Sequence, residues 1–476
     1  MHRNYVGGEW VAADRARDNV NPSDLSDVIG AYAEADEAQA AAAVEAAAAA
    51  FPAWAVSGIQ ARADALEQVA AELLARRDEL GDLLAREEGK TLPEATAEVV
   101  RAGQIFRFFA GEVLRPAGER LPSVRPGVDV EITREPVGVV AIVTPWNFPI
   151  AIPAWKIAPA LAFGNCVVFK PADLVPGSAW ALAEIISRAG FPPGVFNLVM
   201  GRGSRVGQTF IDHPKVNAIS FTGSTATGAR VIAGATCRQA KVQLEMGGKN
   251  PLVVLDDADL GTAVECAVQG VYGSTGQRCT ATSRIIVAKG ILPRFTTALH
   301  ASVQALVVDD ARKHGTQIGP VVDRSQFDSD LAYVSLGSSE GARLLCGGQP
   351  LRRETEGFYL QPALFADADP AMRIAREEIF GPVACIIAVD GYEHALALAN
   401  DTEFGLTAGL CTTSLKHATH FKRHAQAGMV MVNVPTAGVD YHVPFGGRKA
   451  SSYGPREQGR YAAEFFTTVK TAYTAA

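Results

Sequence analysis

The stretch CVVFKPADLVPGSAWALAEIISRAGFPPGVFNLV, residues 166–199, decides the fold. It opens with the short apolar run Cys166–Phe169, which has the length and composition of a buried strand. Apolar residues then recur at helical spacing over Ser178–Ala189, and a second strand-like run follows at Val195–Val199. A strand, a helix and a strand in this order form a βαβ unit, so the two strands are expected to lie parallel in one sheet.

The same alternation extends in both directions along the chain. Further strand-like runs occur at Val139–Val143, Ala218–Phe221 and Lys241–Leu244, with a helical stretch at Ser204–Ile211. A second series lies at Leu252–Leu255, Arg284–Val287, Val383–Val389, Ala408–Cys411 and Met429–Val432. We therefore predict an α/β fold with two doubly wound domains, whose ligands bind at the carboxyl ends of the parallel strands.

The two ends of the chain follow different patterns. After a short hairpin, residues 36–54, 60–88 and 92–111 show apolar residues at helical spacing. Residues 121–134 alternate apolar and polar side chains, which predicts an exposed strand pair, and Phe465–Tyr473 is strand-like. A strand near the terminus needs a partner, and another subunit can supply one.

Composition excludes several classes of protein. The formal net charge of −7 gives no reason to expect nucleic acid or an anionic membrane as a partner. The start of the chain lacks the apolar run of a signal peptide, and the longest apolar stretches are strand-length, so we expect a cytoplasmic protein. The 7 cysteines include no CxxC pair, which argues against a disulfide framework or a structural zinc site, and no metal is expected.

One cysteine stands in a distinctive context. Cys279 follows a glycine-containing turn and Arg278, whose charge favours the thiolate, a nucleophile for aldehyde carbons. Glu245 ends a strand-like run beside two glycines and can serve as a general base, or as an ordinary salt-bridge partner. Asn147 stands in an aromatic loop and can donate to a developing oxyanion, or simply cap the turn.

Three loops that follow strands have features of phosphate or ribose binding. The FTGST run at 221–225 lies between a strand and a helix, where backbone amides suit a phosphate. The GRG run at 201–203, followed by Gly207, is closer to a dinucleotide fingerprint. The KPAD run at 170–173 offers a cation and a carboxylate to ribose hydroxyls. Ordinary loop chemistry is the alternative for each loop.

Together and in this order, the motifs resemble the aldehyde dehydrogenase superfamily over essentially the whole chain. The matching runs are TPWNFP at 144–149, KPAD at 170–173, FTGST at 221–225, EMGGKN at 245–250, GQRC at 276–279, EEIFGPV at 377–383 and PFGG at 444–447. The step of 34 residues from Glu245 to Cys279 is also similar to the family's.

The resemblance implies roles for individual residues and oxidation of an aldehyde to an acid with NAD or NADP. Cys279 would be the nucleophile, Glu245 the base that activates water, Asn147 an oxyanion donor and Lys156 a residue near the proton route. Cofactor contacts are implied for Thr144, Pro145, Trp146, Lys170, Asp173, Gly203, Gly207, Phe221, Gly223, Ser224, Gly247, Glu378 and Phe380.

The resemblance also implies a domain division. Residues 1–116 and 137–247 would form the dinucleotide-binding domain, and 248–449 the catalytic domain. Residues 117–136 and 450–476 would form an oligomerisation element, and closed symmetry favours a homodimer or homotetramer.

Two departures from the family pattern affect the expectations. Met246 replaces the usual Leu after the catalytic Glu, a swap that conserves volume. Asp173 replaces the usual Glu and is one methylene shorter, which leaves room for a 2′-phosphate, so both NAD and NADP stay open.

A narrower resemblance concerns the substrate. The runs at 147–156 and 435–459 are similar to α-ketoglutarate semialdehyde (2,5-dioxovalerate) dehydrogenases, whose substrate carries a carboxylate. Arg278 is the candidate cation for that carboxylate, or else it tunes the thiol or pairs with a neighbouring acid. Trp155, Tyr441 and His442 are candidate lining residues of the same pocket.

Other readings of the same fold remain. A CoA-acylating dehydrogenase would typically lack the Glu245 base, and a non-catalytic structural protein would lose Cys279, Glu245 or Asn147. A broad-range or succinate semialdehyde-like dehydrogenase stays open, because pocket shape depends on loops.

Overall fold

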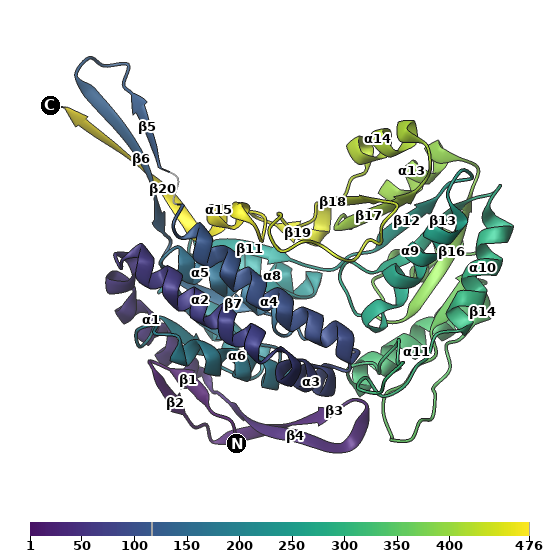
Figure 1. Cartoon of the computed structure of the whole chain (residues 1–476), viewed down its shortest axis with the longest axis horizontal. Coiled ribbons are helices and arrows are strands. Elements are labelled where there is room, and N and C mark those ends of the chain that lie inside the picture. The colour runs from purple at the N-terminus through teal and green to yellow at the C-terminus, as the bar shows by residue number, and fades with distance from the viewer. Residues whose placement is uncertain (116–117, 476) are drawn as a thin grey trace.

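Two large sheets stand side by side, each covered by helices (Figure 1). The computed structural model describes residues 1–115 and 118–475. The first sheet has the strand order β19-β11-β10-β7-β8-β9-β1-β2, and the second β14-β15-β16-β13-β12-β17-β18. The doubly wound α/β fold predicted from the alternating pattern is confirmed.

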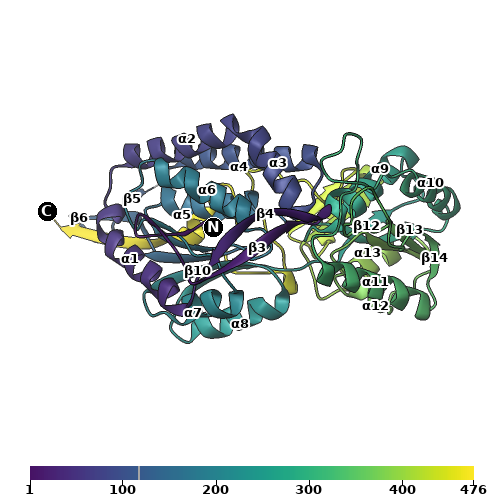
Figure 2. The ribbon, with the colours of Figure 1, turned by 90° about the horizontal axis from the view of Figure 1, so that it is seen from below.

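The first sheet collects strands from both ends of the chain. Its strands are β1 (Asn4–Val6), β2 (Glu9–Val11), β7 (Val139–Val143), β8 (Cys166–Lys170), β9 (Phe196–Leu198), β10 (Val216–Thr222), β11 (Lys241–Glu245) and β19 (Ser452–Tyr453). One face is covered by α2 (Ile59–Ala75), α3 (Arg77–Glu88), α4 (Leu92–Glu112), α5 (Ala151–Ala162) and α6 (Pro176–Arg188) (Figure 2). The other face carries α1 (Glu37–Ala55), α7 (Gln208–Asp212) and α8 (Thr225–Thr236) (Figure 2).

The second sheet is parallel except at its β14 edge. Its strands are β12 (Asn250–Val254), β13 (Thr282–Ala288), β14 (Arg343–Cys346), β15 (Ala363–Ala366), β16 (Val383–Val389), β17 (Thr407–Cys411) and β18 (Met429–Val432). Its helices are α9 (Leu260–Tyr272), α10 (Leu292–Gln304), α11 (Arg324–Ser339), α12 (Arg373–Arg376), α13 (Tyr392–Asn400) and α14 (Leu415–His424).

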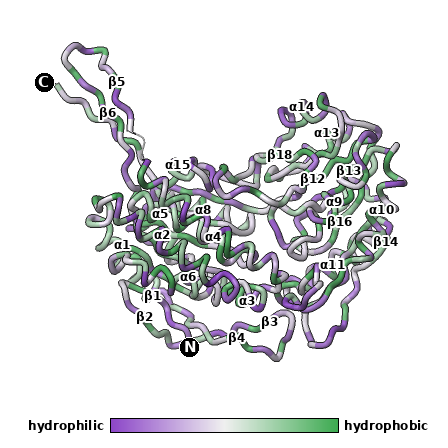
Figure 3. Tube along the Cα trace, in the orientation of Figure 1, coloured by the Kyte–Doolittle hydropathy of each residue, from purple (hydrophilic) through white to green (hydrophobic). Residues whose placement is uncertain are grey.

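The inner strands of the second sheet are buried on both faces, which explains their continuous apolar runs. Val253 and Ile286 point into the cluster on one face, whereas Leu252 and Ile285 point into the cluster on the other. Colouring by hydropathy shows apolar stretches in both sheet regions and hydrophilic stretches in many outer loops (Figure 3).

A smaller sheet projects from the first domain (Figure 1). It consists of β5 (Glu119–Pro122), β6 (Val128–Pro136) and β20 (Thr467–Ala475) in the order β20-β6-β5, and a separate hairpin pairs β3 (Arg15–Asn21) with β4 (Asp24–Glu34). The side chains of Val469 and Tyr473 on β20 are each 60% exposed. The expected exposed pair and strand near the terminus therefore exist and form one unit.

Several expected boundaries differ. The helix expected over 60–88 is two helices, α2 and α3, which meet at Arg76. Phe465, expected in the last strand, belongs to the short helix α15 (Ala463–Phe466). The strand β19, expected in the oligomerisation element, pairs with β11 in the first sheet. The expected boundary between 116 and 117 lies outside the described residues.

The register of the first sheet gathers the predicted loops at one edge. Strands β8, β7, β10 and β11 run parallel, with Val143 opposite Lys170 and Phe221, and Thr222 opposite Glu245. Their carboxyl ends therefore coincide beside the point where the strand order reverses, the place where such sheets bind ligands.

Candidate active site

Cys279 lies just after a sharp turn that follows α9. Ser274 and Thr275 have φ values of 49° and 57°, a region that side-chain-bearing residues rarely adopt. Gly276 follows with a φ of 69°, and a Cβ there would lie 2.3 Å from the carbonyl oxygen of Gly381. The turn holds Cys279 half-buried, with its carbonyl accepting a hydrogen bond of 2.7 Å from the Asn250 side chain.

The environment of the Cys279 thiol raises its pKa. Burial raises its pKa above the usual value, and the carboxylates of Glu378 and Glu245 raise it further. That the charge of Arg278 favours the thiolate stays a prediction, and Arg278 is not among the groups that lower the pKa of Cys279 here. The thiol must lose its proton before it can attack.

Asn147 lies close to the cysteine turn. Its Nδ2 donates to the carbonyl oxygen of Gln277 at 3.0 Å, and its own carbonyl accepts from Lys90 Nζ at 2.7 Å. Lys90 forms a buried ion pair with Glu98 at 2.7 Å, and Glu98 also accepts from the backbone amide of Ile150 at 3.0 Å. A buried charge network thus fixes the loop that presents the Asn147 amide.

Glu245 ends β11 and is buried, with only 2% of its surface exposed. Its carboxylate accepts a hydrogen bond from the Ser452 hydroxyl on the adjacent strand β19. Burial raises its pKa well above the usual value, and the negative charge of Glu457 adds to the rise. Such a carboxyl group binds a proton more strongly than a free one, as a general base at neutral pH requires.

Lys156 lies beside this carboxylate and is fully buried. Its Nζ forms an ion pair with Glu457 and donates to the Ser220 hydroxyl at 2.9 Å. Glu457 was not among the residues predicted from the sequence. It lies in the run at 435–459 that resembles the semialdehyde dehydrogenases, and an acidic residue in that run is the signal that could have identified it.

The guanidinium of Arg278 turns toward the backbone of its own turn. Its Nε donates to the carbonyl of Gly273 at 3.0 Å, and one terminal nitrogen donates to Gln269 at 3.3 Å. The same nitrogen lies 3.8 Å from a carboxylate oxygen of Glu94. This geometry favours the alternative in which Arg278 pairs with a neighbouring acid.

A cavity of about 220 Å³ opens at the carboxyl edge of the first sheet. Predicted cofactor residues that line it are Gly203, Gly207 and Phe221, and the remaining wall includes Val143, Ile219 and Val231. The slot is mainly apolar, as the binding site of a flat base requires. Ser224 caps the adjacent helix α8, with its hydroxyl accepting from the Thr227 amide at 3.3 Å.

Glu378 reaches across to the glycines after Glu245. Its carboxylate accepts from the Gly248 amide at 2.7 Å, and a Cβ on Gly247 would lie 2.2 Å from it. Burial raises the pKa of Glu378 to about 7. Phe380 adopts a left-handed φ of 66° and meets the ring of Trp146 edge-on at 5.3 Å.

Lys170 and Asp173 follow β8 at the same edge. Burial lowers the pKa of Lys170 to about 8, and its Nζ donates to the carbonyl of Pro171 at 2.6 Å. Asp173 is more exposed and forms an ion pair of 2.9 Å with Arg17 on β3. Thr144 and Pro145, also expected here, begin the loop after β7, and the Thr144 amide donates to the Lys170 carbonyl at 3.2 Å.

The expected substrate residues other than Arg278 come from α5 and the loop after β18. The Trp155 ring packs against Phe445 with centroids 5.4 Å apart. Tyr441 meets Phe108 edge-on at 6.3 Å, and His442 is exposed beside it. These contacts form two aromatic groups, one of Trp155 with Phe445 and one of Tyr441 with Phe108 and His442.

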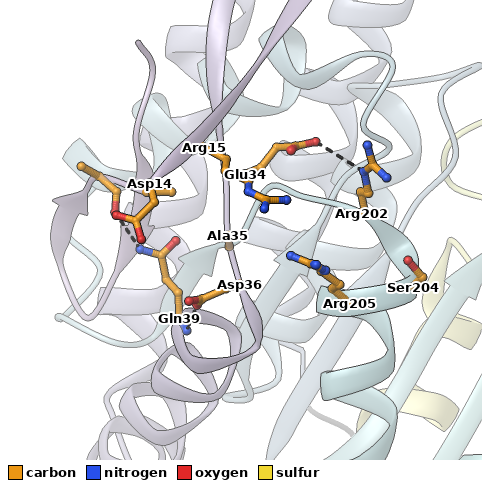
Figure 4. A pocket seen from close by; sticks show the side chains of 11 residues that line it. Asp14, Arg15, Glu34, Ala35, Asp36, Gln39, Arg202, Ser204 and Arg205 are labelled. Carbon is orange, nitrogen blue, oxygen red and sulfur yellow. Dashed lines mark hydrogen bonds and ion pairs between the residues drawn. The ribbon is translucent and has the colours of Figure 1, made fainter.

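A separate cavity of about 370 Å³ lies beside the N-terminal strands (Figure 4). Arg202 faces Glu34 across it at 3.9 Å, and Arg205 comes from the same turn (Figure 4). None of the predicted site residues lines this cavity. It is therefore not part of the candidate active site.

Two structural absences bear on the site. Over residues 1–115 and 118–475, no group of three or more His, Cys, Asp or Glu side chains is placed to hold a metal ion. In the same residues, every helix is too short or too polar to cross a membrane.

Comparison with known proteins gives consistent matches over the whole chain. The model of the aldehyde dehydrogenase family matches residues 10–472. The alpha-ketoglutaric semialdehyde dehydrogenase of Bacillus subtilis (strain 168) is 43% identical, over 99% of this chain and 97% of that protein. The alpha-ketoglutarate semialdehyde dehydrogenase of Haloferax volcanii is 42% identical, over 99% of this chain and 98% of that protein.

A solved structure shares the complete fold. The betaine aldehyde dehydrogenase of Staphylococcus aureus in complex with NAD+ superposes with a TM-score of 0.97 at 33% sequence identity. The match covers 100% of this chain and 95% of that one.

Proposed function

Because the chain belongs to the aldehyde dehydrogenase family, we propose that it oxidises α-ketoglutarate semialdehyde to 2-oxoglutarate through a thioester on Cys279. The observation that carries the reaction class is the placement of the buried carboxyl of Glu245 beside the thiol. The observation that favours this substrate is the full-length similarity to two proteins named for it.

Cys279 is the proposed nucleophile. Its sulfur adds to the aldehyde carbon, and the thiol proton passes to solvent water, which leaves the Glu245 carboxylate free for the later step. The carbonyl oxygen then carries a negative charge. Asn147 Nδ2, held near the cysteine turn by its contact with Gln277, and the backbone amide of Cys279 are the proposed donors to that oxygen.

Glu245 is the proposed base for the second half of the reaction. The chemistry that a bound nicotinamide supplies is acceptance of the hydride from the tetrahedral carbon, which leaves a thioester on Cys279. Glu245 then takes a proton from water, the hydroxyl adds to the thioester carbon, and the carbon–sulfur bond breaks to release the acid. The Lys156–Glu457 pair lies beside Glu245 and provides a route for that proton.

The presence of Glu245 separates this proposal from its main rival. In a CoA-acylating dehydrogenase the thiol of CoA removes the acyl group from the cysteine. Water is not activated there, so no buried base such as Glu245 is needed. Here three residues act on the pKa of the carboxyl group. Glu457 raises that pKa, whereas Ser452 and Lys156 lower it. A carboxyl group whose proton affinity is set by three neighbours suits a base for water, so the surroundings of Glu245 favour hydrolysis of the thioester over transfer to CoA.

The residues at the edge of the first sheet fit a nicotinamide dinucleotide. The apolar cavity lined by Gly203, Gly207 and Phe221 suits the adenine, and the N-terminus of α8 suits a phosphate. Glu378 offers a carboxylate for the nicotinamide ribose, and Gly247 leaves the space that it occupies.

We propose that both NAD and NADP are accepted. Lys170 and Asp173 are the candidates for the adenosine ribose. The ion pair of Asp173 with Arg17 neutralises the carboxylate that would otherwise repel a 2′-phosphate.

Assembly and location complete the proposal. The projecting sheet presents exposed apolar side chains such as Val469 and Tyr473, which favours a homodimer or a dimer of dimers. A cytoplasmic location remains a prediction. The 7 free cysteines fit it, because cytosolic thiols stay reduced.

Initial rates for a panel of aldehydes test the substrate. The panel contains α-ketoglutarate semialdehyde, succinate semialdehyde, butanal and betaine aldehyde, each with NAD and with NADP. We expect the highest kcat/KM for α-ketoglutarate semialdehyde, and no effect of added CoA on the product. A preference for butanal or betaine aldehyde would instead identify a dehydrogenase of uncharged or cationic aldehydes.

A further inference from the structure

A group of unpartnered hydrogen-bond donors lies where α4 meets α5 and the loop after β19. Arg101 Nε, Trp155 Nε1 and the Gln458 side-chain Nε2 are each buried, and none has a hydrogen-bond partner within the described chain. All three are N–H donors. Buried polar groups in folded proteins are nearly always satisfied, so a set of three neighbouring donors without partners points to an acceptor from outside the chain.

The contacts of Arg101 bring these donors together. Its guanidinium carbon lies 5.6 Å from the centroid of the Trp155 ring, and one terminal nitrogen donates to Gln458 Oε1 at 3.2 Å. That bond fixes the orientation of the Gln458 amide. Its oxygen is used by the arginine, and its NH2 group is left facing elsewhere without a partner.

Arg101 also lacks a counter-ion. No Asp or Glu oxygen lies within 4.0 Å of it among residues 1–115 and 118–475. The carboxylates whose charge acts on it are Glu98, which is bonded to Lys90, and Asp440, which is exposed on the loop after β18. A largely buried guanidinium without an ion pair is costly unless an anion completes it.

The position of the group relates it to the reacting centre. Trp155 precedes Lys156 and Gln458 follows Glu457, so both donors are chain neighbours of the buried ion pair beside Glu245. The Trp155 ring packs on Phe445, and a Cβ on the next residue, Gly446, would lie 2.7 Å from a Glu245 oxygen. An aromatic wall therefore connects the catalytic carboxyl group with Arg101.

We propose that Arg101, with Trp155 and Gln458, binds the distal carboxylate of the substrate. The inference rests on the proposed function, because it assigns the carboxylate of that substrate to these donors. The guanidinium supplies the charge, the indole and amide supply two further N–H groups, and the aromatic wall contacts the methylenes between the aldehyde and the carboxylate. Arg278, whose donors serve its own turn and Glu94, is then a structural residue of the cysteine loop.

Substitution of Arg101 tests the proposal. In Arg101→Met the KM for α-ketoglutarate semialdehyde should rise roughly tenfold or more, whereas the KM for butanal stays within about twofold. In Arg101→Lys the KM for α-ketoglutarate semialdehyde should lie between these two values, because lysine keeps the positive charge but cannot donate two parallel N–H groups to a carboxylate. Arg107→Met is the matched control, since Arg107 lies on the same helix and pairs with Glu67 at the surface.

A second measurement separates this inference from the identity of the substrate. Glutarate should inhibit butanal oxidation competitively in the wild type and in Arg107→Met, and much less in Arg101→Met and in Trp155→Phe, which keeps an aromatic ring but lacks the indole N–H. If wild type prefers another carboxylated aldehyde but glutarate inhibition depends on Arg101, the substrate proposal fails and the inference holds. Equal losses on butanal and the semialdehyde, or glutarate inhibition unchanged in every folded variant, would overturn the inference.

Discussion

Lys156 and Glu457 form an ion pair sealed from solvent, although 301 positions separate them in the chain. Their side chains are 0% and 1% exposed, and the second oxygen of Glu457 has no partner in the described structure. Desolvation of such a pair costs about as much as the attraction returns, so its presence is weak evidence for a stabilising role. Its position beside Glu245 instead favours a role in setting the charge of that base.

Removal of the Glu457 charge should change the pH profile of turnover. Glu457 raises the pKa of Glu245, so in Glu457→Gln that pKa falls and the acid limb of kcat moves to lower pH. The unpaired Lys156 should also cost about 3–5 kcal/mol of unfolding free energy, measured in urea. The double variant Lys156→Met/Glu457→Gln should regain most of the stability without regaining the rate. A double variant with wild-type turnover would exclude the pair from catalysis.

Glu245→Gln should separate the two halves of the reaction. Without the base for water, kcat should fall by at least about a hundredfold. The acyl-enzyme should accumulate, and mass spectrometry of the quenched protein should detect it on Cys279. Ser452→Ala, which removes a hydrogen bond to the same carboxylate, is expected to reduce kcat far less. Absence of the acyl-enzyme in Glu245→Gln would assign Glu245 to the first step instead.

The reactivity of Cys279 should rise with pH in the ligand-free protein. Its raised pKa keeps the thiol protonated at neutral pH, so alkylation by iodoacetamide should be slow at pH 7 and increase above pH 8. Peptide mapping separates Cys279 from the exposed Cys237. Alkylation of Cys279 faster than that of a free thiol at pH 7 would contradict the structure.

Cofactor binding should strengthen as the pH rises through neutrality. Glu378 has a pKa of about 7, and its ionised form is the one that accepts hydrogen bonds from ribose hydroxyls. The group is mainly protonated at pH 6 and mainly ionised at pH 8, so the Kd for NADH should fall by up to about tenfold over this range. Fluorescence titration measures it. Glu378→Gln should show weaker binding and no such dependence; an unchanged slope would point to another group.

Arg17 should influence the choice between NAD and NADP. Arg17→Ala removes the cation paired with Asp173, so the ratio of kcat/KM for NADP to that for NAD should fall about fivefold. Asp173→Ser should raise the same ratio, because it removes the negative charge. Arg15→Ala, on the same strand, is the control. The same ratio in all three variants would place the 2′ position away from this pair.

Local patterns predicted the strands well because each is a short continuous apolar run, mainly buried in β7 and β16 and half-buried in β18. The runs at Val139–Val143, Val383–Val389 and Met429–Val432 match β7, β16 and β18 residue for residue. The break between α2 and α3 was missed, because Arg76 is an ordinary helix former and its three glutamate partners come together only in the folded protein.

Motifs predicted that Cys279, Glu245 and the edge of the first sheet carry the function, and these roles stay predictions, but side-chain direction lies outside what a motif shows. Arg278 adjoins Cys279 in sequence, and its guanidinium nevertheless bonds to Gly273 and Gln269. Arg101 is one of several arginines on a helix, and it becomes distinctive only when Trp155 and Gln458 pack around it. Such relationships depend on tertiary contacts between distant segments.

The segment that follows β18 contributes both to the surroundings of Glu245 and to the projecting sheet. Ser452, Glu457 and Gln458 contact the reacting centre or its neighbours, and β20 begins a few residues later in the projecting sheet. The chain between them is the short helix α15, with Phe465 and Phe466 anchored in the core of the first domain. This helix holds the two parts of the segment at a fixed place on the first domain. The exposed strand β20 and the Ser452 hydroxyl that bonds to Glu245 therefore belong to one continuous stretch of the chain, so a test of assembly in β20 variants should also measure the pH dependence of turnover.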